Sequence, residues 1–232
     1  MANELFTGAQ MVVKSLAALK VKYIFGYPGG SVLDIYDAIF QQDEVEHILV
    51  RHEQAATHMA DGYTRATGEV GVVLATSGPG ATNCITGIAT AYMDSIPMVV
   101  LAGQVPTHLI GDDAFQETDI VGCSRPVVKH SFSCRDLSEL PNTFAKAFHI
   151  AATGRPGPVV IELPKDLQQR EAEFHIDTNV SMRSYKPSDK GHPKQIRKAV
   201  ETIAQAKKLV IYSGGGIVIA DADKQLTKLV EK

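Results

Sequence analysis

The chain has 232 residues, 44% of them hydrophobic, and carries 23 Lys and Arg against 26 Asp and Glu, a formal net charge of −3. This composition is typical of a globular protein with a buried core, and without a dense Lys/Arg run it argues against nucleic acid and anionic membrane as partners. Three cysteines without a C-x-x-C pair argue against a disulfide framework or a zinc site and fit a reducing compartment. The N-terminal "MANELFTGAQ" indicates neither a signal peptide nor a membrane span, so we expect a soluble protein of the cytoplasm.

Short apolar runs alternate with amphipathic stretches along the first part of the chain, which is typical of a parallel α/β sheet. The predicted strands are residues 22–27, 47–50, 71–76, 98–103, 126–131 and 158–163. The predicted helices are residues 5–20, 31–40, 53–68, 80–94 and 140–154. Leu5 is expected on the apolar face of the first helix, Ser31 as the N-cap of the second, and the third is expected to end near Gly68. Residues 1–170 are therefore predicted to form one doubly wound, mostly parallel six-stranded domain.

The pattern changes after residue 170. Residues 171–193 are polar, contain Pro187, Gly191 and Pro193, and are predicted to be a linker. Residues 194–232 follow the order helix, strand, glycine turn and helix. About 40 residues with a single strand cannot form a stable sheet alone, so we expect this part to be the incomplete start of a second α/β domain.

Ligands of open parallel sheets bind beyond the carboxyl ends of the strands. Four polar or glycine-rich turns fall there, namely "GYPGGS" (26–31), "RHEQ" (51–54), "TSGPGATN" (76–83) and "GQVPTHLIGDDAFQE" (103–117). "TSGPGATN" has the form of an anion cradle before a helix, but it matches no dinucleotide or P-loop pattern, and a tight turn without phosphate is an equal alternative. "RHEQAATH" lacks the H-E-x-x-H spacing of a metal site, and Ser77 lacks the context of a nucleophile elbow.

Glu53 is the most informative residue of these turns. Its simplest explanation is a solvated carboxylate at a helix start, where the macrodipole favours negative charge. However, an apolar strand precedes it, Ala55 and Ala56 follow it, and glycine turns adjoin it. In such a pocket, desolvation and the helix end act on the carboxyl in opposite directions, which suits a group that exchanges a proton near neutrality.

Six segments in this order resemble the large catalytic subunit of acetohydroxyacid synthase (acetolactate synthase): "FGYPGG", "RHEQAA…MADGY", "TSGPGATN", "DSIPMVVLAGQV", "DAFQE" and "GRPGPVVIELPKD". The resemblance covers essentially the whole chain and is closest to bacterial forms. It implies that residues 1–170 are a thiamine-diphosphate pyrimidine-binding domain and that the FAD-binding domain begins after the linker. It further implies decarboxylation of pyruvate and its condensation with a second 2-oxo acid, pyruvate or 2-oxobutyrate, in valine, leucine and isoleucine biosynthesis.

The resemblance also implies roles for single residues. Glu53 would hydrogen-bond N1′ of the aminopyrimidine, and the resulting imino tautomer would remove the thiazolium C2 proton. Gly30, Ser77, Phe115 and Gln116 would lie beside the coenzyme, with Gln116 near the reacting carbons. Lys165 would act at the mouth of a substrate channel that Pro106 and Ser31 line. Arg155, Gly214, Gly215 and Gly216 would contact FAD, although surface charge is the simplest explanation of both Arg155 and Lys165.

The chain departs from the family pattern in several ways. Ser31 stands where the family usually has alanine, and Thr107–His108 occupy a variable pair. Neither G-D-G nor N-N occurs, so the resemblance implies that Mg²⁺ is held by a C-terminal domain and by no residue of this chain. We therefore expect the chain alone to be inactive, and the complete enzyme to be a homodimer through its pyrimidine domain with a small regulatory subunit. A pyruvate oxidase, a 2-oxo-acid decarboxylase and a non-catalytic remnant that only dimerises are the alternatives, and "DAFQE" with "LPKD" favours the synthase.

Overall fold

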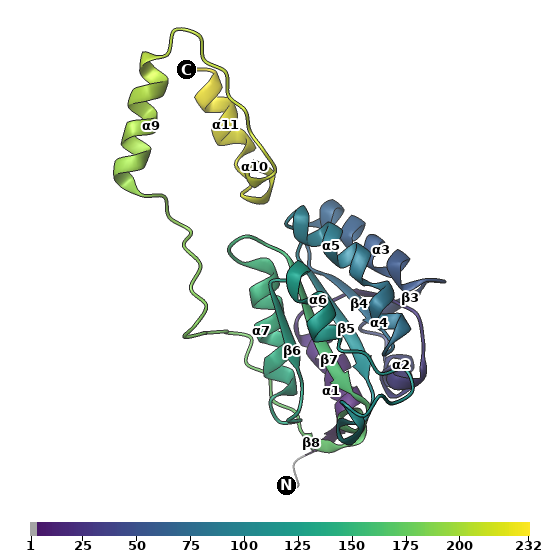
Figure 1. Ribbon diagram of the computed structural model, residues 1–232. Helices are drawn as coiled ribbons and strands as arrows, with labels where there is room; N and C mark the ends of the chain where they lie inside the picture. The colour runs from purple at the N-terminus through teal and green to yellow at the C-terminus, as the bar shows by residue number, and fades with distance from the viewer. Residues whose placement is uncertain (1–3) are drawn as a thin grey trace. The chain divides into compact units, whose positions relative to one another are not determined.

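Six parallel strands form the central sheet of the protein, whose computed structural model describes residues 4–232 (Figure 1). Their order across the sheet is β3-β2-β4-β5-β7-β6, and every neighbouring pair is parallel. The strands are β2 (Tyr23–Gly26), β3 (Glu46–Leu49), β4 (Gly71–Ala75), β5 (Met98–Gln104), β6 (His130–Ser133) and β7 (Pro158–Pro164). The predicted doubly wound α/β fold is confirmed.

Helices cover both faces of this sheet because successive strand side chains point to opposite sides. On β4, Val72 and Leu74 face one apolar core, whereas Val73 and Ala75 face the other. The first core is closed by α1 (Gly8–Ala18), α2 (Leu33–Phe40), α7 (Leu140–Ala152) and α8 (Lys165–Gln169). The second is closed by α3 (Glu53–Thr67), α4 (Pro79–Asn83), α5 (Ile85–Met93) and α6 (Ile120–Ser124) (Figure 1).

Helix ends follow the capping residues of the sequence. Thr7 and Gln10 form a capping box at the start of α1, in which each side chain accepts the backbone N–H of the other. The end of α3 at Gly68 is confirmed, since this glycine takes the left-handed conformation with φ of 77°. The predicted cap at Ser31 is wrong, because its side chain makes no capping bond at the start of α2 or of the preceding 3₁₀ turn η1 (Gly30–Val32).

Two further predictions are wrong, one at the start of the first helix and one at the start of a strand. Leu5 does not begin a helix, because β1 (Leu5–Thr7) pairs antiparallel with β8 (Glu171–Glu173), the segment with which the predicted linker begins. The strand predicted from Pro126 begins only at His130, because a 3₁₀ turn, η3 (Arg125–Val127), takes its place. Proline has no N–H for a sheet ladder, which favours this turn over a strand.

The chain divides into two compact units, Met1–Pro187 and Ser188–Lys232. Tyr185 ties the polar segment after β8 to the first unit, because its hydroxyl accepts from Lys129 Nζ at 3.0 Å and donates to the Thr153 carbonyl at 2.8 Å. Residues 171–187 of the predicted linker therefore belong to the first unit, and only residues 188–193 belong to the second.

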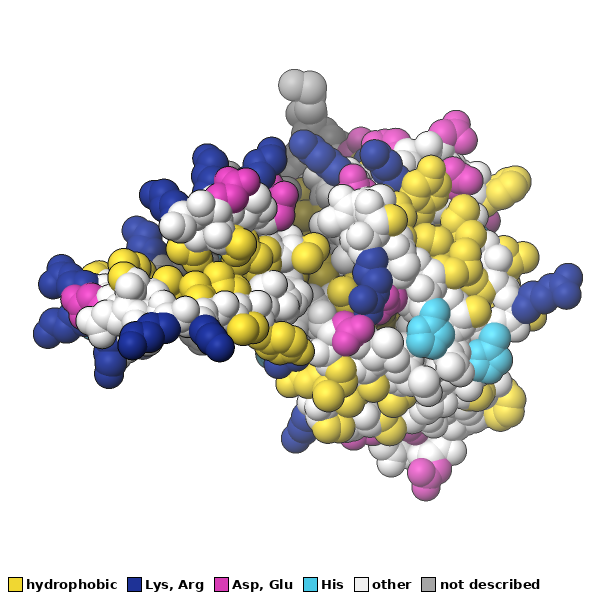
Figure 2. Space-filling model, turned by 90° about the horizontal axis from the view of Figure 1, so that it is seen from above, with side chains coloured by type: hydrophobic (Ala, Val, Ile, Leu, Met, Phe, Trp, Pro, Cys, Tyr) yellow, Lys and Arg dark blue, Asp and Glu magenta, His cyan; other side chains and the backbone are white. Residues whose placement is uncertain are grey.

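The second unit contains three helices among its described residues: α9 (Pro193–Gln205), α10 (Gly216–Ile219) and α11 (Asp223–Val230). The strand expected before the glycine turn is absent there, and Tyr212 is 99% exposed. A single apolar run has no neighbour to pair with, so it forms no ladder. Figure 2 shows hydrophobic side chains exposed between Lys and Arg side chains on this unit, at the left of the view.

Candidate functional site

The turns after β2 and β4 are joined at the carboxyl edge of the sheet, where the strand order changes direction. Ser31 Oγ lies 2.9 Å from Thr76 Oγ1 and accepts the Ser77 N–H at 2.8 Å. Ser31 and Ser77 are both buried. Ser31 therefore connects two turns that are far apart in the sequence, which is the role of its hydroxyl in this chain.

Glu53 is the first residue of α3 and is only 7% exposed although it carries a carboxyl group. His52 precedes it as the N-cap, and its Nδ1 accepts the Gln54 N–H at 3.1 Å. Asn83 Nδ2 donates a 2.9 Å hydrogen bond to Glu53 Oε2. Oε1 accepts no hydrogen bond from the residues that the structure describes. The site thus contains a buried carboxylate in which one oxygen accepts a hydrogen bond and the other accepts none from the described residues.

Gly80 provides the space beside the free oxygen. A Cβ at this position would lie 3.1 Å from Glu53 Oε1 and 2.7 Å from Thr76 Cγ2. The methyl group of Thr76 also closes the space around Gly29, where a Cβ would lie 2.5 Å away. Thr76 therefore bridges the glycine turn after β2 and the pocket of Glu53.

Two titratable neighbours of Glu53 stay neutral at pH 7. Burial, and secondly the charge of Glu53, raise the pKa of the Cys84 thiol to about 12. The same two causes, in the same order, raise the pKa of the Tyr36 phenol well above its ordinary value. The Tyr36 hydroxyl lies 3.1 Å from His47 Nε2, and burial lowers the pKa of that imidazole. The Cys84 thiol and the Tyr36 phenol are therefore uncharged at pH 7.

Gly30 and Lys165 lie together at this edge of the sheet. Lys165 Nζ donates to the Gly30 carbonyl at 2.7 Å and lies 3.3 Å from Asp34 Oδ2. A Cβ built at Gly30 would meet nothing within 4 Å among the described residues. Contacts within the chain therefore do not require glycine here, and the space beside its backbone is open to a ligand.

The loop of Phe115 and Gln116 contacts the turn after β4. The Gln116 backbone has a φ of 58°, and its carbonyl oxygen would lie 2.5 Å from a Cβ at Gly78. Only glycine at position 78 permits this approach. Phe115 and Gln116 are both exposed, so their side chains are free to contact a ligand.

Pro106 follows β5, and the residue after it ties this turn to the start of α8. The N–H and hydroxyl of Thr107 donate to the Asp166 carboxylate at 2.8 and 2.7 Å. Burial alone would raise the pKa of Asp166, but the hydrogen bonds from Thr107 hold it below its ordinary value. This bond pair places Pro106 beside Lys165.

Arg155, one of the predicted FAD residues, does not join this cluster. Arg155 precedes β7, at the opposite, amino edge of the sheet, and donates to Ser95 Oγ at 2.8 Å. It also donates to the carbonyls of Tyr92 and Met93 at 3.2 Å each, at the end of α5. Gly214, Gly215 and Gly216 belong to the second unit.

Sequence reasoning missed three residues of the site: Tyr36, Thr76 and Asn83. Thr76 and Asn83 are the first and last residues of "TSGPGATN", a segment identified only for its glycines and serine. A search for side chains that can donate to a buried carboxylate would have selected Asn83. Tyr36 has no signal in the sequence, because only the fold brings it near Glu53.

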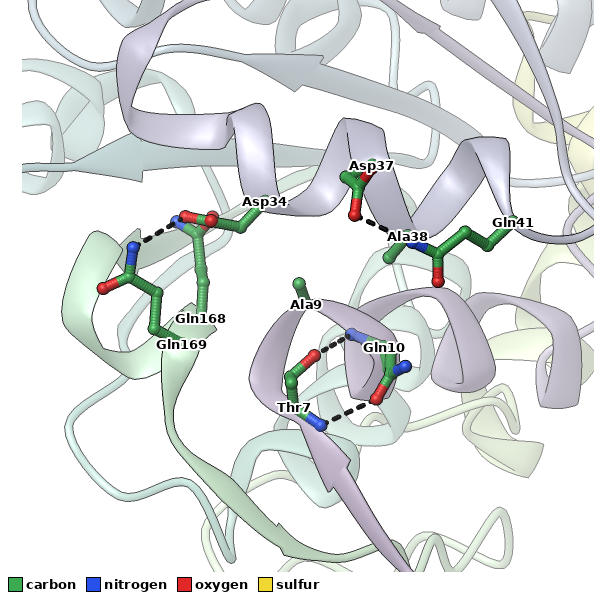
Figure 3. A pocket seen from close by; sticks show the side chains of 9 residues that line it. All are labelled: Thr7, Ala9, Gln10, Asp34, Asp37, Ala38, Gln41, Gln168 and Gln169. Carbon is green, nitrogen blue, oxygen red and sulfur yellow. Dashed lines mark hydrogen bonds between the residues drawn. The ribbon is translucent and has the colours of Figure 1, made fainter.

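A polar cavity of about 260 Å³ lies beside this site, between α1, α2 and α8 (Figure 3). Gln168 lines it and donates from Nε2 to the carbonyls of Ser31 and Leu163, whereas its buried Oε1 has no partner among the described residues. Glu53 and Gly30 do not line this cavity, so it is separate from the Glu53 pocket.

Among residues 4–232, no group of three or more His, Cys, Asp or Glu side chains is placed to hold a metal ion. No helix in the same range has the length and apolar character that crossing a membrane requires.

Known proteins match the chain over this site. Residues 6–123 match the family model described as "Thiamine pyrophosphate enzyme, N-terminal TPP binding domain". The acetolactate synthase isozyme 3 large subunit of Escherichia coli (strain K12) is 60% identical over 98% of this chain and 40% of its own length. The acetolactate synthase large subunit of Buchnera aphidicola subsp. Schizaphis graminum is 58% identical over 99% of this chain and 40% of its own. The chain thus spans about two-fifths of the length of these relatives.

Proposed function

Because the chain belongs to the thiamine pyrophosphate enzymes, whose N-terminal TPP binding domain it carries, we propose that it forms the pyrimidine half of an acetolactate synthase active site. The complete enzyme would decarboxylate pyruvate and condense the two-carbon unit with a second 2-oxo acid. The observation that carries this proposal is Glu53, a buried carboxylate with one free oxygen at the switch point of the sheet.

The residues of the pocket fit the aminopyrimidine of thiamine diphosphate. The open space beside Gly30 admits a flat ring against the backbone. Glu53 Oε1 is free to exchange a proton with a ring nitrogen, and the side chain is only 7% exposed to water. When bound, the coenzyme supplies the electron sink of the reaction, and the protein supplies orientation and the proton-exchanging carboxyl.

Other residues would act on the substrate side. Lys165 places a positive charge at the mouth of the site, where it attracts the carboxylate of a 2-oxo acid. Gln116, with Phe115 beside it, projects an exposed amide next to the turn after β4. Pro106 and Ser31 complete the channel wall in this proposal.

The roles of FAD and Mg²⁺ are proposed from the resemblance of the sequence to acetohydroxyacid synthase. Arg155 and Gly214 to Gly216 would contact FAD in the complete enzyme, where the flavin has no redox role. The diphosphate and Mg²⁺ would be held by a domain outside this chain, because the G-D-G and N-N segments that hold them in the family do not occur in this sequence. The cytoplasm is the proposed location.

We further propose a homodimer through α3 and α5. The outward side of α3 carries exposed small and apolar residues, namely Ala55, Met59, Gly62 and Ala66, and Met93 at the end of α5 is 72% exposed. Light scattering should give a dimer mass that falls to the monomer value in Met59→Lys. Phe40→Lys, at an exposed apolar residue of α2, should leave the mass unchanged. A small regulatory subunit is an additional partner of the complete enzyme in this proposal.

The test of the catalytic proposal needs a complete active site. We define the joined enzyme as this chain fused to the remaining three-fifths of the Escherichia coli relative, with which it shares 60% identity over the aligned part. In the joined enzyme, Glu53→Gln should slow C2-proton exchange of bound thiamine diphosphate by on the order of a hundredfold, since an amide cannot exchange the proton. Glu44→Gln, at an exposed carboxylate, should leave the exchange rate unchanged. An unchanged rate in Glu53→Gln would refute the proposal.

The 232-residue chain by itself should make no acetolactate. It supplies one carboxylate and apolar contact to the coenzyme, whereas a doubly anionic diphosphate needs a cation and its ligands. A colorimetric acetoin assay with saturating coenzyme, Mg²⁺, FAD and pyruvate tests this expectation. Activity of the pure chain would favour a complete site within these residues.

The alternatives predict other products. A pyruvate oxidase or a 2-oxo-acid decarboxylase would use the same Glu53 pocket, but the joined enzyme would then form acetyl phosphate or free aldehyde. A non-catalytic remnant would give no product in the joined enzyme and would still dimerise. The 54 to 60% identity to acetolactate synthase large subunits of bacteria and of Methanocaldococcus jannaschii supports the synthase.

A further inference from the structure

The Asn83 amide is held against Glu53 by two separate helices. Glu53 begins α3 and Asn83 ends α4, 30 residues later. Asn83 Nδ2 lies 2.9 Å from Glu53 Oε2, and a carboxylate oxygen only accepts, so the amide nitrogen must be the group that faces it. Asn83 is part-buried and Glu53 is buried, so water competes weakly for this bond.

The bond makes the two oxygens of Glu53 different. The terminal torsion of a glutamate side chain is broad, so the carboxylate is free to rotate unless another group holds it. Asn83 occupies Oε2, while Oε1 lies over Gly80, where the absence of a side chain leaves room. A rotated carboxylate would turn both oxygens away from this arrangement and leave the Asn83 amide without its partner.

We propose that Asn83 is a positioning residue, which orients the Glu53 carboxylate so that Oε1 alone faces the pyrimidine of the coenzyme. The inference rests on the proposed function of Glu53 and adds a residue to it. Asn83 itself does not exchange a proton, because an amide does not titrate in the working range. Its effect is to keep one oxygen available in a fixed direction and to stabilise the charged carboxylate by a charge-assisted bond.

The contact itself is testable in the 232-residue chain without any cofactor. Asn83→Asp keeps the size of the side chain but places a second carboxylate against Glu53. We expect a lower midpoint of urea unfolding at pH 7, and a smaller difference from the parent chain as the pH falls and carboxylates become protonated. In a Glu53→Gln background the same substitution should lose most of its effect, because the like charge is gone. An effect of equal size in both backgrounds would overturn the contact.

The positioning role is testable in the joined enzyme. Asn83→Leu removes the donor but keeps the number and branching of the side-chain heavy atoms, and it should slow C2-proton exchange of bound thiamine diphosphate by on the order of tenfold to a hundredfold. The affinity for the coenzyme, measured separately by fluorescence quenching, should stay within about threefold of the parent, because the diphosphate end dominates binding. Asn142→Leu is the matched control, since the side chain of this partly buried asparagine of α7 accepts the Asp177 N–H at 3.1 Å and has no contact with Glu53.

The outcomes separate this inference from the proposed function. Slower exchange in both Glu53→Gln and Asn83→Leu, with no change in Asn142→Leu, supports both. Slower exchange in Glu53→Gln with a normal rate in Asn83→Leu overturns the positioning role and leaves the proposed function standing. A normal rate in Glu53→Gln refutes the proposed function itself. A loss of coenzyme affinity in Asn83→Leu that accounts for the whole loss of exchange also overturns the positioning role.

Discussion

The ammonium group of Lys165 donates a 2.7 Å hydrogen bond to the carbonyl oxygen of Gly30, which lies 135 residues earlier in the chain. This bond connects the start of α8, at the end of β7, with the turn after β2. Asp34 lies 3.3 Å away and partly balances the charge of the lysine. The turn that is proposed to receive the coenzyme is therefore bound by the partly exposed ammonium group of Lys165.

Lys165→Met should act on the substrate more than on the fold. The pair with Asp34 is half-exposed, so its loss should cost the chain less than about 1 kcal/mol of unfolding free energy. In the joined enzyme the loss of positive charge should raise the KM for pyruvate by roughly tenfold, about 1.4 kcal/mol. Lys165→Arg, which keeps the charge, should show a smaller rise. A KM that is unchanged in Lys165→Met would remove this residue from the substrate channel.

Alanine substitutions at Gly29 and Gly30 distinguish an effect on packing from an effect on coenzyme binding. Gly29→Ala should destabilise the chain by about 1–3 kcal/mol, because the added Cβ would lie 2.5 Å from the Thr76 side chain. Gly30→Ala should change stability by less than about 0.5 kcal/mol, because its Cβ would meet nothing within 4 Å. In the joined enzyme Gly30→Ala should nevertheless weaken coenzyme binding, since the methyl group enters the space assigned to the ring. Urea unfolding and coenzyme titration measure the two effects, and normal coenzyme affinity in Gly30→Ala would contradict the assignment.

Asp166 makes the Pro106 turn sensitive to acid. Burial acts to raise the pKa of this carboxyl, but the Thr107 bonds outweigh it and lower the pKa. The folded chain then binds this proton less readily than the unfolded chain, so the stabilisation is present at neutral pH and is lost as the pH falls below about 4. Thr107→Val should cost about 0.5–1.5 kcal/mol at pH 7 and less at pH 3.

Urea unfolding at pH 7, 5 and 3 tests this expectation. Thr90→Val is the control, because the Thr90 hydroxyl donates to a backbone carbonyl that does not titrate. Its effect should be the same at each pH. A Thr107→Val effect that does not shrink in acid would show that the Asp166 bond contributes nothing to the pH dependence.

Arg155 has a structural role in the first unit that does not depend on the proposed contact with FAD. Its guanidinium satisfies the Tyr92 and Met93 carbonyls at the end of α5, where positive charge is also favoured by the macrodipole. Arg155→Met should therefore lower the unfolding free energy by about 1–2 kcal/mol. In the joined enzyme, weaker flavin binding at a temperature where the fold is intact would support the proposed FAD contact. Unchanged flavin binding there would leave only the structural role.

Local periodicity was enough to place most of the sheet. Apolar runs such as 71–76 and 158–163 became β4 and β7, because a strand buried on both faces needs an almost unbroken apolar sequence. Gly68 ended α3 where expected, since the left-handed cap is a property of a single residue. Glu53 was identified from its neighbours along the chain, an apolar strand before it and small residues after it.

Only the tertiary structure decided which side chains meet. Leu5 left its predicted helix because its strand partner lies at 171–173, and Ser31 capped no helix because Thr76 and Ser77 bind its hydroxyl. Asn83 reached Glu53 from another helix, and Arg155 lay at the opposite edge of the sheet. The physical reason is the range of the interactions. Periodicity and capping depend on residues within one or two turns, whereas contacts between loops depend on strand order, which is set by the packing of the whole sheet.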